Sequence, residues 1–396
     1  MSQIETPVRP THVGLAITAL ALGGFAIGTT EFVTMGLLPE IARGIGESIP
    51  TTGHVISAYA FGVVVGAPVI VSLAARLPRR ELAIGLILAL GLGNVLTALA
   101  NGYWEMMAAR FLSGLPHGAY FGVASLVAAS LVDPSRRGRA VSGVMLGLTF
   151  ATVAGVPAST WLGQNIGWRS AYWTVLALAV LTAVMVLAVV PHQQGNAEAT
   201  VRAELAALKQ PQVLYAVSAG MVGFGGIFAM YSYISPTVTD VTRVSSSAIP
   251  GFLLAFGVGG VVGTWLAGRL ADWDVERSVI FGFAAMVVTL VLFTLAAGWV
   301  VPAVALVFVI GGLGGVLAIN LQIRLMHAAG DAQMLGAALN HSALNVANGL
   351  GAWIGSVVIA AGHGYRAPSL AGAGLAVLGL IVFGIGLRAA RTIRPA

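Results

Sequence analysis

The sequence contains no cysteine and very little charge. Charged residues make up only 9% of its 396 residues, whereas hydrophobic residues make up 58%, and the mean hydropathy is +0.92. No ordinary soluble domain needs so apolar a composition, so the sequence predicts an integral membrane protein. The lack of cysteine also excludes disulfides and thiolate metal sites.

Motifs of enzymatic and ATP-driven chemistry are missing as well. The chain has no Gly-x-x-x-x-Gly-Lys-Ser/Thr phosphate loop, no His-Glu-x-x-His metal site and no serine with a convincing acid and base partner. We therefore expect the protein not to be an enzyme, and we expect no cofactor and no bound metal.

Long apolar segments recur along the whole chain. A transmembrane helix needs about 20 apolar residues, and these segments approach or exceed that length without the alternation typical of barrel strands. The sequence predicts an all-α integral membrane protein with twelve transmembrane helices. They are expected at residues 13–38, 53–75, 81–100, 104–131, 140–163, 169–190, 213–235, 249–271, 277–297, 302–326, 335–361 and 369–390.

Lysine and arginine favour one side of the predicted membrane. If both chain termini are cytoplasmic, 15 basic residues lie in cytoplasmic segments, 4 lie on the other side, and Arg110 lies inside a span. Positive residues stay on the cytoplasmic side, so we expect both termini there. The sequence pI of about 10.1 then reflects membrane orientation. Nucleic acid is not an expected partner, whereas the lipid bilayer is.

The longest polar interruption divides the chain into two halves. We expect six-helix bundles at residues 1–190 and 213–396, joined by a cytoplasmic linker at 191–212. Apolar residues of the linker recur at helical spacing opposite charged ones, which predicts an amphipathic helix at the membrane interface.

The two halves also resemble diverged copies of each other. The segment Val71–Leu82 follows the second predicted helix, and Gly268–Val279 follows the eighth. Both lie on the same predicted side of the membrane and at the same place in their half. This positional match indicates a parallel internal repeat.

Glu31 is the acidic residue that lies deepest inside a predicted span. A carboxylate at membrane depth is costly, which favours a functional role. Gly24, Gly28, Glu31 and Met35 recur at spacings of four and three, so they share a face that can pack against other helices. A carboxyl group there can exchange a proton near neutral pH. Glu31 is therefore a candidate proton carrier or substrate contact, and a structural carboxyl satisfied by hydroxyls such as that of Thr30 is the alternative.

Arg110 and His117 lie seven residues apart in the fourth predicted helix and can face the same interior. Arginine stays protonated and needs an anionic or carbonyl partner, whereas histidine titrates near neutral pH. Together with Glu31 they form a candidate proton-coupling group. The alternatives are a pair between Arg110 and Glu105, and a fixed hydrogen bond from His117 to a carbonyl.

Amides and aromatic side chains recur in three later helices. His341, Asn345 and Asn348 share one face of the eleventh predicted helix, with Asn340 nearby. Such a stripe either clasps another helix or lines a watery cavity. Amides with aromatics suit a polar organic ligand with a flat part, although aromatics alone can simply pack. The candidate cavity residues are Thr30, Thr34, Tyr120, Phe228, Tyr231, Asn320, Gln322, His341, Asn345 and Asn348.

Three segments of the chain resemble a known family. They are Thr29–Ala42, Ala154–Arg169 and Asn340–Gly351. With the two-half plan, they resemble the bacterial drug:proton antiporter group of the major facilitator superfamily, over essentially the whole chain. Among its branches the chain is most similar to the sugar-efflux and arabinose-efflux permeases, with chloramphenicol-resistance exporters nearby.

The resemblance implies roles for particular residues. Glu31 matches the acidic position that such antiporters use for proton coupling, Arg110 matches the arginine of their helix 4 motif, and His117 matches a histidine of sugar-efflux relatives. The gating motifs of the family correspond to Arg76, Arg79, Arg80, Gly155, Pro157, Gly163, Gly268, Asp272 and Arg277.

The first loop motif departs from the family pattern. Ala75 and Pro78 stand where that pattern has an aspartate and a glycine. The usual charge pairing is therefore not expected in the first half. We expect Asp272, with Arg269 or Arg277, to supply part of it.

The resemblance implies a multi-pass transporter of the bacterial inner membrane that exports a drug, sugar or nucleoside in exchange for protons by alternating access. A facilitator or proton symporter for a sugar or nucleoside is one alternative. A membrane receptor or scaffold is another, although the short loops argue against it. The expected partners are a small-molecule substrate, protons and lipid, and the expected state is a monomer.

Overall fold

The described part of the chain is built from helices, as the sequence predicts. The computed structural model describes residues 13–74, 77–194, 210–329 and 333–393, and these residues contain no strand. The α-helices are α1 (Val13–Gly36), α2 (Leu38–Ile45), α3 (Ile49–Ala74), α4 (Arg79–Leu99), α5 (Tyr103–Ser130), α6 (Arg137–Phe150), α7 (Val156–Ile166), α8 (Arg169–Val189), α10 (Pro211–Gly223), α11 (Gly225–Tyr231), α12 (Ile234–Pro236), α13 (Ile249–Ala296), α14 (Val300–Ala328), α15 (Gln333–Val358) and α16 (Ala367–Ile393). Short 3₁₀ turns lie at Pro134–Arg136 and Ser246–Ala248, and π turns lie at Ala151–Gly155, Thr237–Val241 and Ile359–His363.

Within the described residues, eleven helical stretches are long and apolar enough to cross a membrane. One of them, Ser246–Ala296, has 51 residues. That length corresponds to roughly 75 Å of helix, more than twice the ~30 Å hydrocarbon core of a bilayer. Large apolar side chains remain on the outside, including Trp104 at 78% exposure and Val301 at 79%. Such a surface suits lipid rather than water.

The sequence predicts separate helices over 249–271 and 277–297, whereas the structure joins them in α13. Inside α13 only Asp274 has a non-helical backbone, with φ −172° and ψ 112°. Its side chain accepts a hydrogen bond from the backbone N–H of Arg277 at 2.9 Å, which caps the segment that follows. The Ser278 hydroxyl donates to the Leu270 carbonyl at 2.8 Å across the kink. A single extended residue therefore replaces the predicted loop.

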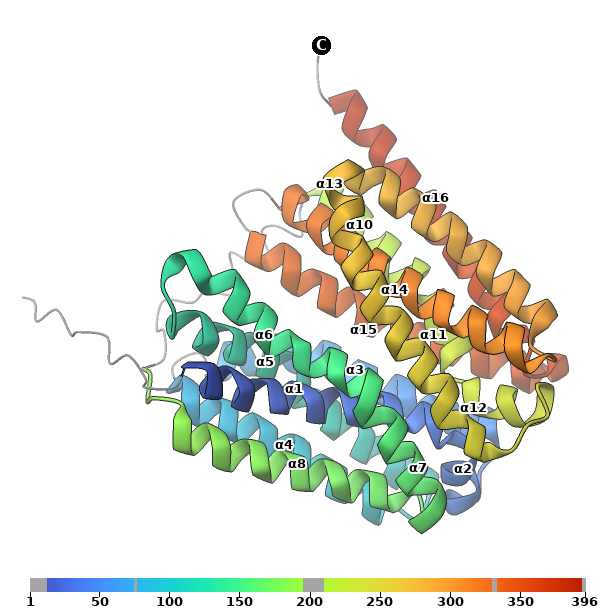
Figure 1. Cartoon of the computed structure of the whole chain (residues 1–396), viewed down its shortest axis with the longest axis horizontal. Helices are drawn as coiled ribbons and strands as arrows, with labels where there is room; N and C mark the ends of the chain where they lie inside the picture. Colours follow the sequence, from blue (N-terminus) through green and yellow to red (C-terminus); the bar gives the residue numbers. More distant parts are fainter. Residues whose placement is uncertain (1–12, 75–76, 195–209, 330–332, 394–396) are drawn as a thin grey trace, which may run out of the picture.

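The helices form two groups that pack mostly within themselves (Figure 1). Helices α1 to α8, coloured blue to green, form the first group, and α10 to α16, coloured yellow to red, form the second. The two groups meet where α3 packs against α15 and where α13 packs against α7. The predicted amphipathic helix of the linker lies in 195–209, outside the described residues.

Glycines bring particular helix pairs very close together. In the first group, Gly62 and Gly114 lie where α3 and α5 cross, and each faces a backbone carbonyl of the other helix. In the second group, Gly259 and Gly263 do the same between α13 and α14. A Cβ atom at any of these positions would overlap that carbonyl, so small residues permit the approach.

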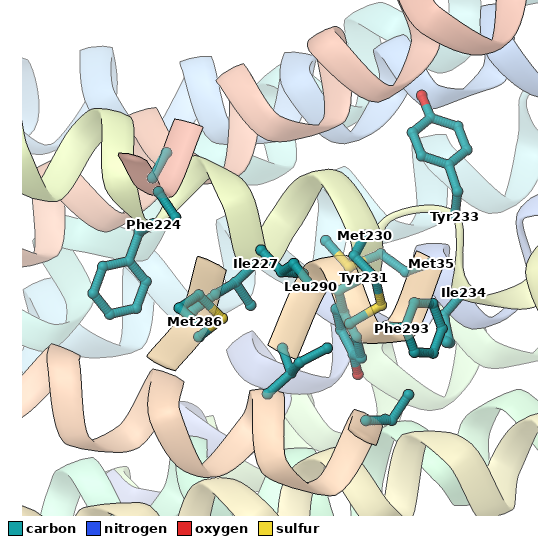
Figure 2. Packing of buried hydrophobic residues seen from close by; sticks show 14 of the residues in the cluster. Met35, Phe224, Ile227, Met230, Tyr231, Tyr233, Ile234, Met286, Leu290 and Phe293 are labelled. Carbon is teal, nitrogen blue, oxygen red and sulfur yellow. The ribbon is translucent and has the colours of Figure 1, made fainter. Parts of the chain in front are cut away.

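The largest apolar cluster extends from the second group into the first. Its buried members come mainly from α10 to α16, and it also includes Met35, Leu38, Ile56 and Val156 of the first group. Figure 2 shows Met35 in this cluster together with Tyr231. Apolar packing therefore seals part of the contact between the two groups.

Candidate functional site

Glu31 is buried where the two groups of helices meet. Its exposure is 6%. One turn earlier, Gly28 lies against Leu148, so α1 packs closely on α6. On the other side, the side-chain amide of Asn348 in α15 donates a hydrogen bond to Glu31 Oε1 at 3.2 Å. This hydrogen bond joins the first group of helices to the second.

Arg110 is fully buried in α5. Its guanidinium donates to the Thr30 hydroxyl at 3.0 Å and to the Thr30 carbonyl at 3.1 Å. It also lies 4.3 Å from the centre of the Tyr59 ring. The Thr30 hydroxyl in turn donates to Asn94 Oδ1 at 2.6 Å. Glu105, the partner in the alternative interpretation, accepts instead from a backbone N–H just before α5.

Tyr59 of α3 connects the three predicted proton-coupling residues. Its hydroxyl lies 3.0 Å from His117 Nδ1, and its ring supports the guanidinium of Arg110. Glu31 and Arg110 interact electrostatically with each other and with Tyr59. Glu31, Arg110 and His117 therefore belong to one cluster, but through a tyrosine that the sequence analysis did not identify. A lone tyrosine in an apolar span was the only signal for it.

The polar stripe of α15 faces the first group of helices. At one end Asn348 binds Glu31, and at the other His341 stacks on Phe121 of α5 with ring centres 6.2 Å apart. Asn345 lies between them on the same face and donates its side-chain N–H to the His341 carbonyl at 3.0 Å. Asn340 donates to Ala318 of α14 at 3.2 Å, so it clasps a neighbouring helix of its own group.

An aromatic cluster lies next to Glu31. Phe32 stacks on Phe228 with ring centres 6.5 Å apart and meets Tyr231 edge-on at 6.2 Å. Tyr231 stacks on Phe256 at 4.0 Å. Two of the candidate cavity residues, Phe228 and Tyr231, are therefore in direct contact with the residue that follows Glu31.

Other candidate cavity residues lie elsewhere. Tyr120 donates to the Leu20 carbonyl at 2.9 Å, roughly 16 Å along α1 from Glu31 at 1.5 Å per residue. Asn320 donates to the Val316 carbonyl at 2.9 Å within α14 and more weakly toward α13. Thr34 bonds to the Tyr172 hydroxyl at 2.9 Å inside the first group, and Gln322 is half-buried on α14. Tyr120, Asn320 and Thr34 therefore hold helices together within one group. Helical spacing alone did not distinguish this role from lining a cavity.

Hydrogen bonds also join the two groups near the start of α3 and the end of α15, a contact that we call the α3–α15 seam. Ser57 donates to the Gly349 carbonyl at 2.8 Å. His54 lies with Nε2 3.1 Å from the Ser356 hydroxyl and with Nδ1 3.0 Å from the Tyr103 hydroxyl. The sequence analysis did not identify His54, whose signal was a histidine within the first turns of an apolar span.

The arginines of the first loop motif are partly described. Arg80 pairs with Glu81 at 2.8 Å, and Glu81 also bonds to His192 Nδ1 at 3.0 Å. Arg79 donates its backbone N–H to the Gln193 carbonyl at 2.9 Å. The contact of Glu81 with His192 and that of Arg79 with Gln193 tie the start of α4 to the segment after α8. Arg76 lies outside the described residues.

The fifth predicted helix contains a π turn at the glycine of its motif. Ala151–Gly155 forms this turn between α6 and α7, and Pro157 lies in the first turn of α7. Proline cannot donate to the carbonyl four residues earlier, which favours such a local widening of the helix. Gly155 faces Thr29 and Phe25 of α1, and Gly163 faces Leu37. Gly155 therefore allows close contact with α1, and Gly163 allows close contact with the residue that follows α1.

The charge pairs of the second loop motif differ from the expected ones. Arg277 pairs with Asp274 at 3.4 Å rather than with Asp272, because Asp274 caps the helical segment that begins there. Arg269 lies over the ring of Trp265, 3.7 Å from its centre. Gly268 has open space where a Cβ would stand, and Asp272 is exposed. The expected pairing of Asp272 with Arg269 or Arg277 is therefore wrong.

The comparisons of this chain with known proteins agree on one family. The model of the Major Facilitator Superfamily matches residues 20–338. The inner membrane transport protein YdhP of Escherichia coli strain K12 is 41% identical over 371 residues, which cover 93% of this chain and 95% of that protein. A chloramphenicol resistance protein of Streptomyces lividans is 33% identical over 372 residues, covering 93% and 95%.

A solved structure has the same fold. The nucleoside transporter NupG matches with a TM-score of 0.74 over 94% of this chain and 99% of that one. The sequence identity is 13%, so this likeness concerns the arrangement of helices.

Proposed function

This chain belongs to the major facilitator superfamily, so it is a membrane transporter of small molecules rather than an enzyme, and on that premise we propose that it exports a small organic substrate in exchange for protons. The observation that carries this proposal is the hydrogen bond between Asn348 and Glu31. It links a buried ionisable group to the opposite group of helices. Protonation of that group can therefore affect how the two groups fit together.

We propose twelve membrane crossings with both termini in the cytoplasm of a bacterium. Eleven apolar stretches lie in the described residues, and the kink at Asp274 divides the longest of them into two. The excess of arginine and lysine on one side supports the orientation. The two transporting bundles are 1–190 and 213–396, joined by the linker 191–212. The similarity to an inner membrane protein supports the same location for this chain.

In the proposed cycle the two bundles rock around the cluster at Glu31. The α3–α15 seam joins the bundles at the end that this topology puts outside. Substrate then enters from the cytoplasm, and opening of the seam releases it outward. A proton from outside binds Glu31 before the return step and leaves toward the cytoplasm.

Arg110 and Tyr59 have distinct parts in this cycle. Arg110 interacts electrostatically with Glu31 and compensates the charge of the ionised carboxylate in the interior. Tyr59 keeps Arg110 in place through its ring and bonds to His117 through its hydroxyl. His117 is a candidate relay for the proton that Glu31 exchanges.

The substrate class follows from the side chains beside Glu31. Phe32, Phe228 and Tyr231 offer flat apolar surfaces, and the α15 stripe offers amides. Such a lining suits a drug, sugar or nucleoside with a ring and polar groups. The similarity to a chloramphenicol resistance protein supports the inclusion of amphenicol drugs among the candidates.

The test is transport by Glu31→Gln in proteoliposomes with an imposed pH gradient. The wild type is expected to accumulate substrate against its gradient, and the variant is expected to lose accumulation while retaining exchange at equal concentrations. Glu105→Gln, which changes an exposed carboxyl group of α5, serves as the control and should behave as the wild type. If Glu31→Gln still accumulates substrate, Glu31 is not the coupling residue. Wild-type counterflow without any pH-linked accumulation would favour a facilitator instead.

A further inference from the structure

Three of the buried polar atoms without a hydrogen-bond partner among the described residues belong to the α15 stripe and to the aromatic cluster that contains Phe32. They are Asn345 Oδ1, Asn348 Oδ1 and the Tyr231 hydroxyl. Each belongs to a side chain that is at most 6% exposed. A buried acceptor without a partner is costly, so such atoms indicate a bound group that the protein alone does not provide.

The free oxygen of Asn348 depends on the state of Glu31. An ionised carboxylate can only accept hydrogen bonds, so the amide must present its N–H, as it does at 3.2 Å. The amide oxygen then remains available to another donor. A protonated carboxyl group carries an O–H and can donate to the amide oxygen once the amide turns over. The same oxygen is then occupied.

Asn345 has no such dependence. Its side-chain N–H is bound to the His341 carbonyl, which can only accept. The amide orientation is therefore fixed, and Asn345 Oδ1 stays available whether Glu31 is ionised or protonated. The stripe thus contains one acceptor that responds to the proton and one that does not.

We propose that Asn348 makes substrate and proton mutually exclusive: its amide oxygen accepts a hydrogen bond from the substrate while Glu31 is ionised, and from the Glu31 carboxyl group once that group is protonated. The proposal rests on the proton-coupled export described above and adds the residue that couples the two ligands. Asn345 contributes a second, constant acceptor.

The same acceptors define the chemistry of the substrate. A molecule with two O–H or N–H donors on one edge satisfies Asn345 and Asn348. A carboxylate or phosphate would instead face two amide oxygens and the Glu31 carboxylate, which repel it. The substrate class is therefore an uncharged or cationic organic molecule with adjacent hydrogen-bond donors and an apolar face.

Other titratable groups lie around this site. Tyr59 of α3, Arg110 and His117 of α5, and His341 of α15 all lie near Glu31 or along the stripe. None of these side chains forms a hydrogen bond with Asn348 among the described contacts. A change at Asn348 therefore tests the coupling without removing one of these groups.

The experiment measures binding of chloramphenicol, which carries two hydroxyls and an amide N–H, to purified protein at acidic and alkaline pH. Wild-type affinity is expected to fall by about tenfold per pH unit on the acidic side, because one proton competes with one substrate. Asn348→Ala should weaken binding about three- to tenfold at alkaline pH and remove most of the pH dependence.

Matched variants separate this role from a merely structural one. Asn345→Ala should weaken binding by a similar factor and keep the wild-type pH profile. Glu31→Gln should bind less tightly than the wild type at alkaline pH and show no pH dependence, because its amide does not titrate and its N–H can donate to Asn348 Oδ1. Exchange by this variant is therefore expected only at saturating substrate. The diacetate of chloramphenicol, whose hydroxyls are blocked, should lose affinity for the wild type. Asn348→Leu, which has a similar volume and no acceptor, provides a second variant if Asn348→Ala fails to fold.

Several results would overturn the proposal. One is a wild-type pH profile in Asn348→Ala or Asn348→Leu, and another is a flattened profile in Asn345→Ala. Equal binding of chloramphenicol and its diacetate would remove the donor requirement. If the wild type binds none of chloramphenicol, methyl β-glucoside and uridine, the proposed substrate class is wrong. Loss of pH-driven transport in the wild type itself would instead refute the proton coupling on which the inference rests.

Discussion

The α3–α5 pair of the first group and the α13–α14 pair of the second are packed alike and contain different chemistry. In both pairs glycines face the backbone carbonyls of the partner helix. Within the α3–α5 pair, Tyr59 of α3 contacts both Arg110 and His117 of α5. Beside α13–α14 lies Asn320, which bonds to carbonyls of the two helices. Close helix packing is a requirement of either group, whereas buried charge is a feature of the first.

The same contrast extends to all described residues. The buried charged side chains, Glu31 and Arg110, belong to the first group, while the second buries amides and hydroxyls. The side-chain N–H of a buried amide such as Asn320 is satisfied by nearby carbonyls, but a buried charge needs a network. In the proposed cycle, the proton carrier and its counter-charge therefore lie in the first group, and most of the hydrogen-bonding groups proposed for the substrate lie in the second.

The largest test of this contrast is Arg110→Met. It leaves the Glu31 charge uncompensated and removes the donors to Thr30, so we expect a loss of about 3–5 kcal/mol in the free energy of unfolding. Combining it with Glu31→Gln should recover part of that loss. Asn320→Leu in the second group should cost only about 1 kcal/mol. Denaturant unfolding of the purified protein in detergent measures all three, and equal costs at Arg110 and Asn320 would contradict the contrast.

The shared packing predicts equal effects in both groups. Gly114→Ala and Gly263→Ala each place a Cβ against a facing carbonyl, and each should cost about 1–3 kcal/mol of stability. Gly122→Ala in α5 and Gly268→Ala in α13 meet open space. They should be neutral or stabilise by up to about 1 kcal/mol, because alanine favours the helix. Thermal unfolding checks the four variants, and a large cost in one group alone would show that the two pairs are not equivalent.

Two tyrosines sharpen the comparison further. The Tyr59 hydroxyl bonds to His117 at 3.0 Å, whereas the Tyr231 hydroxyl has no partner among the described residues. Tyr59→Phe should therefore cost about 0.5–1.5 kcal/mol of stability, and Tyr231→Phe about zero. Each of the two substitutions removes only the hydroxyl group from a buried ring. A substantial destabilisation by Tyr231→Phe, measured in the same unfolding experiment, would reveal a missing partner for that hydroxyl.

A small effect is also expected at the contact between the groups. Ser356→Ala removes a hydroxyl bonded to Pro50 and His54 of α3, and it should favour opening of the α3–α15 seam by about 0.5–1 kcal/mol. Because the chain has no cysteine, the single cysteine introduced by Ala352→Cys reports the opening directly. Its alkylation should be about two- to fivefold faster with Ser356→Ala. An unchanged rate would mean that apolar packing alone holds the seam.

Much of the architecture could be predicted from local patterns. Composition and long apolar runs indicate helices that cross a membrane, because each helix satisfies its own backbone groups in lipid. The depth of Glu31 in α1 and the polar face of α15 follow from helical periodicity within one segment. The break predicted between residues 271 and 277 is present at Asp274. Hydropathy does not indicate that a single extended residue makes it, with hydrogen bonds of Asp274 and Ser278 bridging the kink.

The candidate site was predictable only in part. Glu31, Arg110, His117 and Asn348 were among the candidates, but Tyr59, which connects three of them, was not. Tyr120 and Asn320 were candidates for the cavity and instead hold helices of one group together. A polar residue in an apolar helix looks the same in sequence whether it clasps a neighbour or faces a substrate.

The sequence by itself determined the helical membrane architecture and the few polar groups that it must accommodate. Only the tertiary structure decided which of those groups meet. Glu31 and Asn348 are 317 residues apart in the chain and 3.2 Å apart at their hydrogen bond. Spans depend on hydropathy over about 20 consecutive residues, but a contact of this kind depends on how two separate groups of helices pack together.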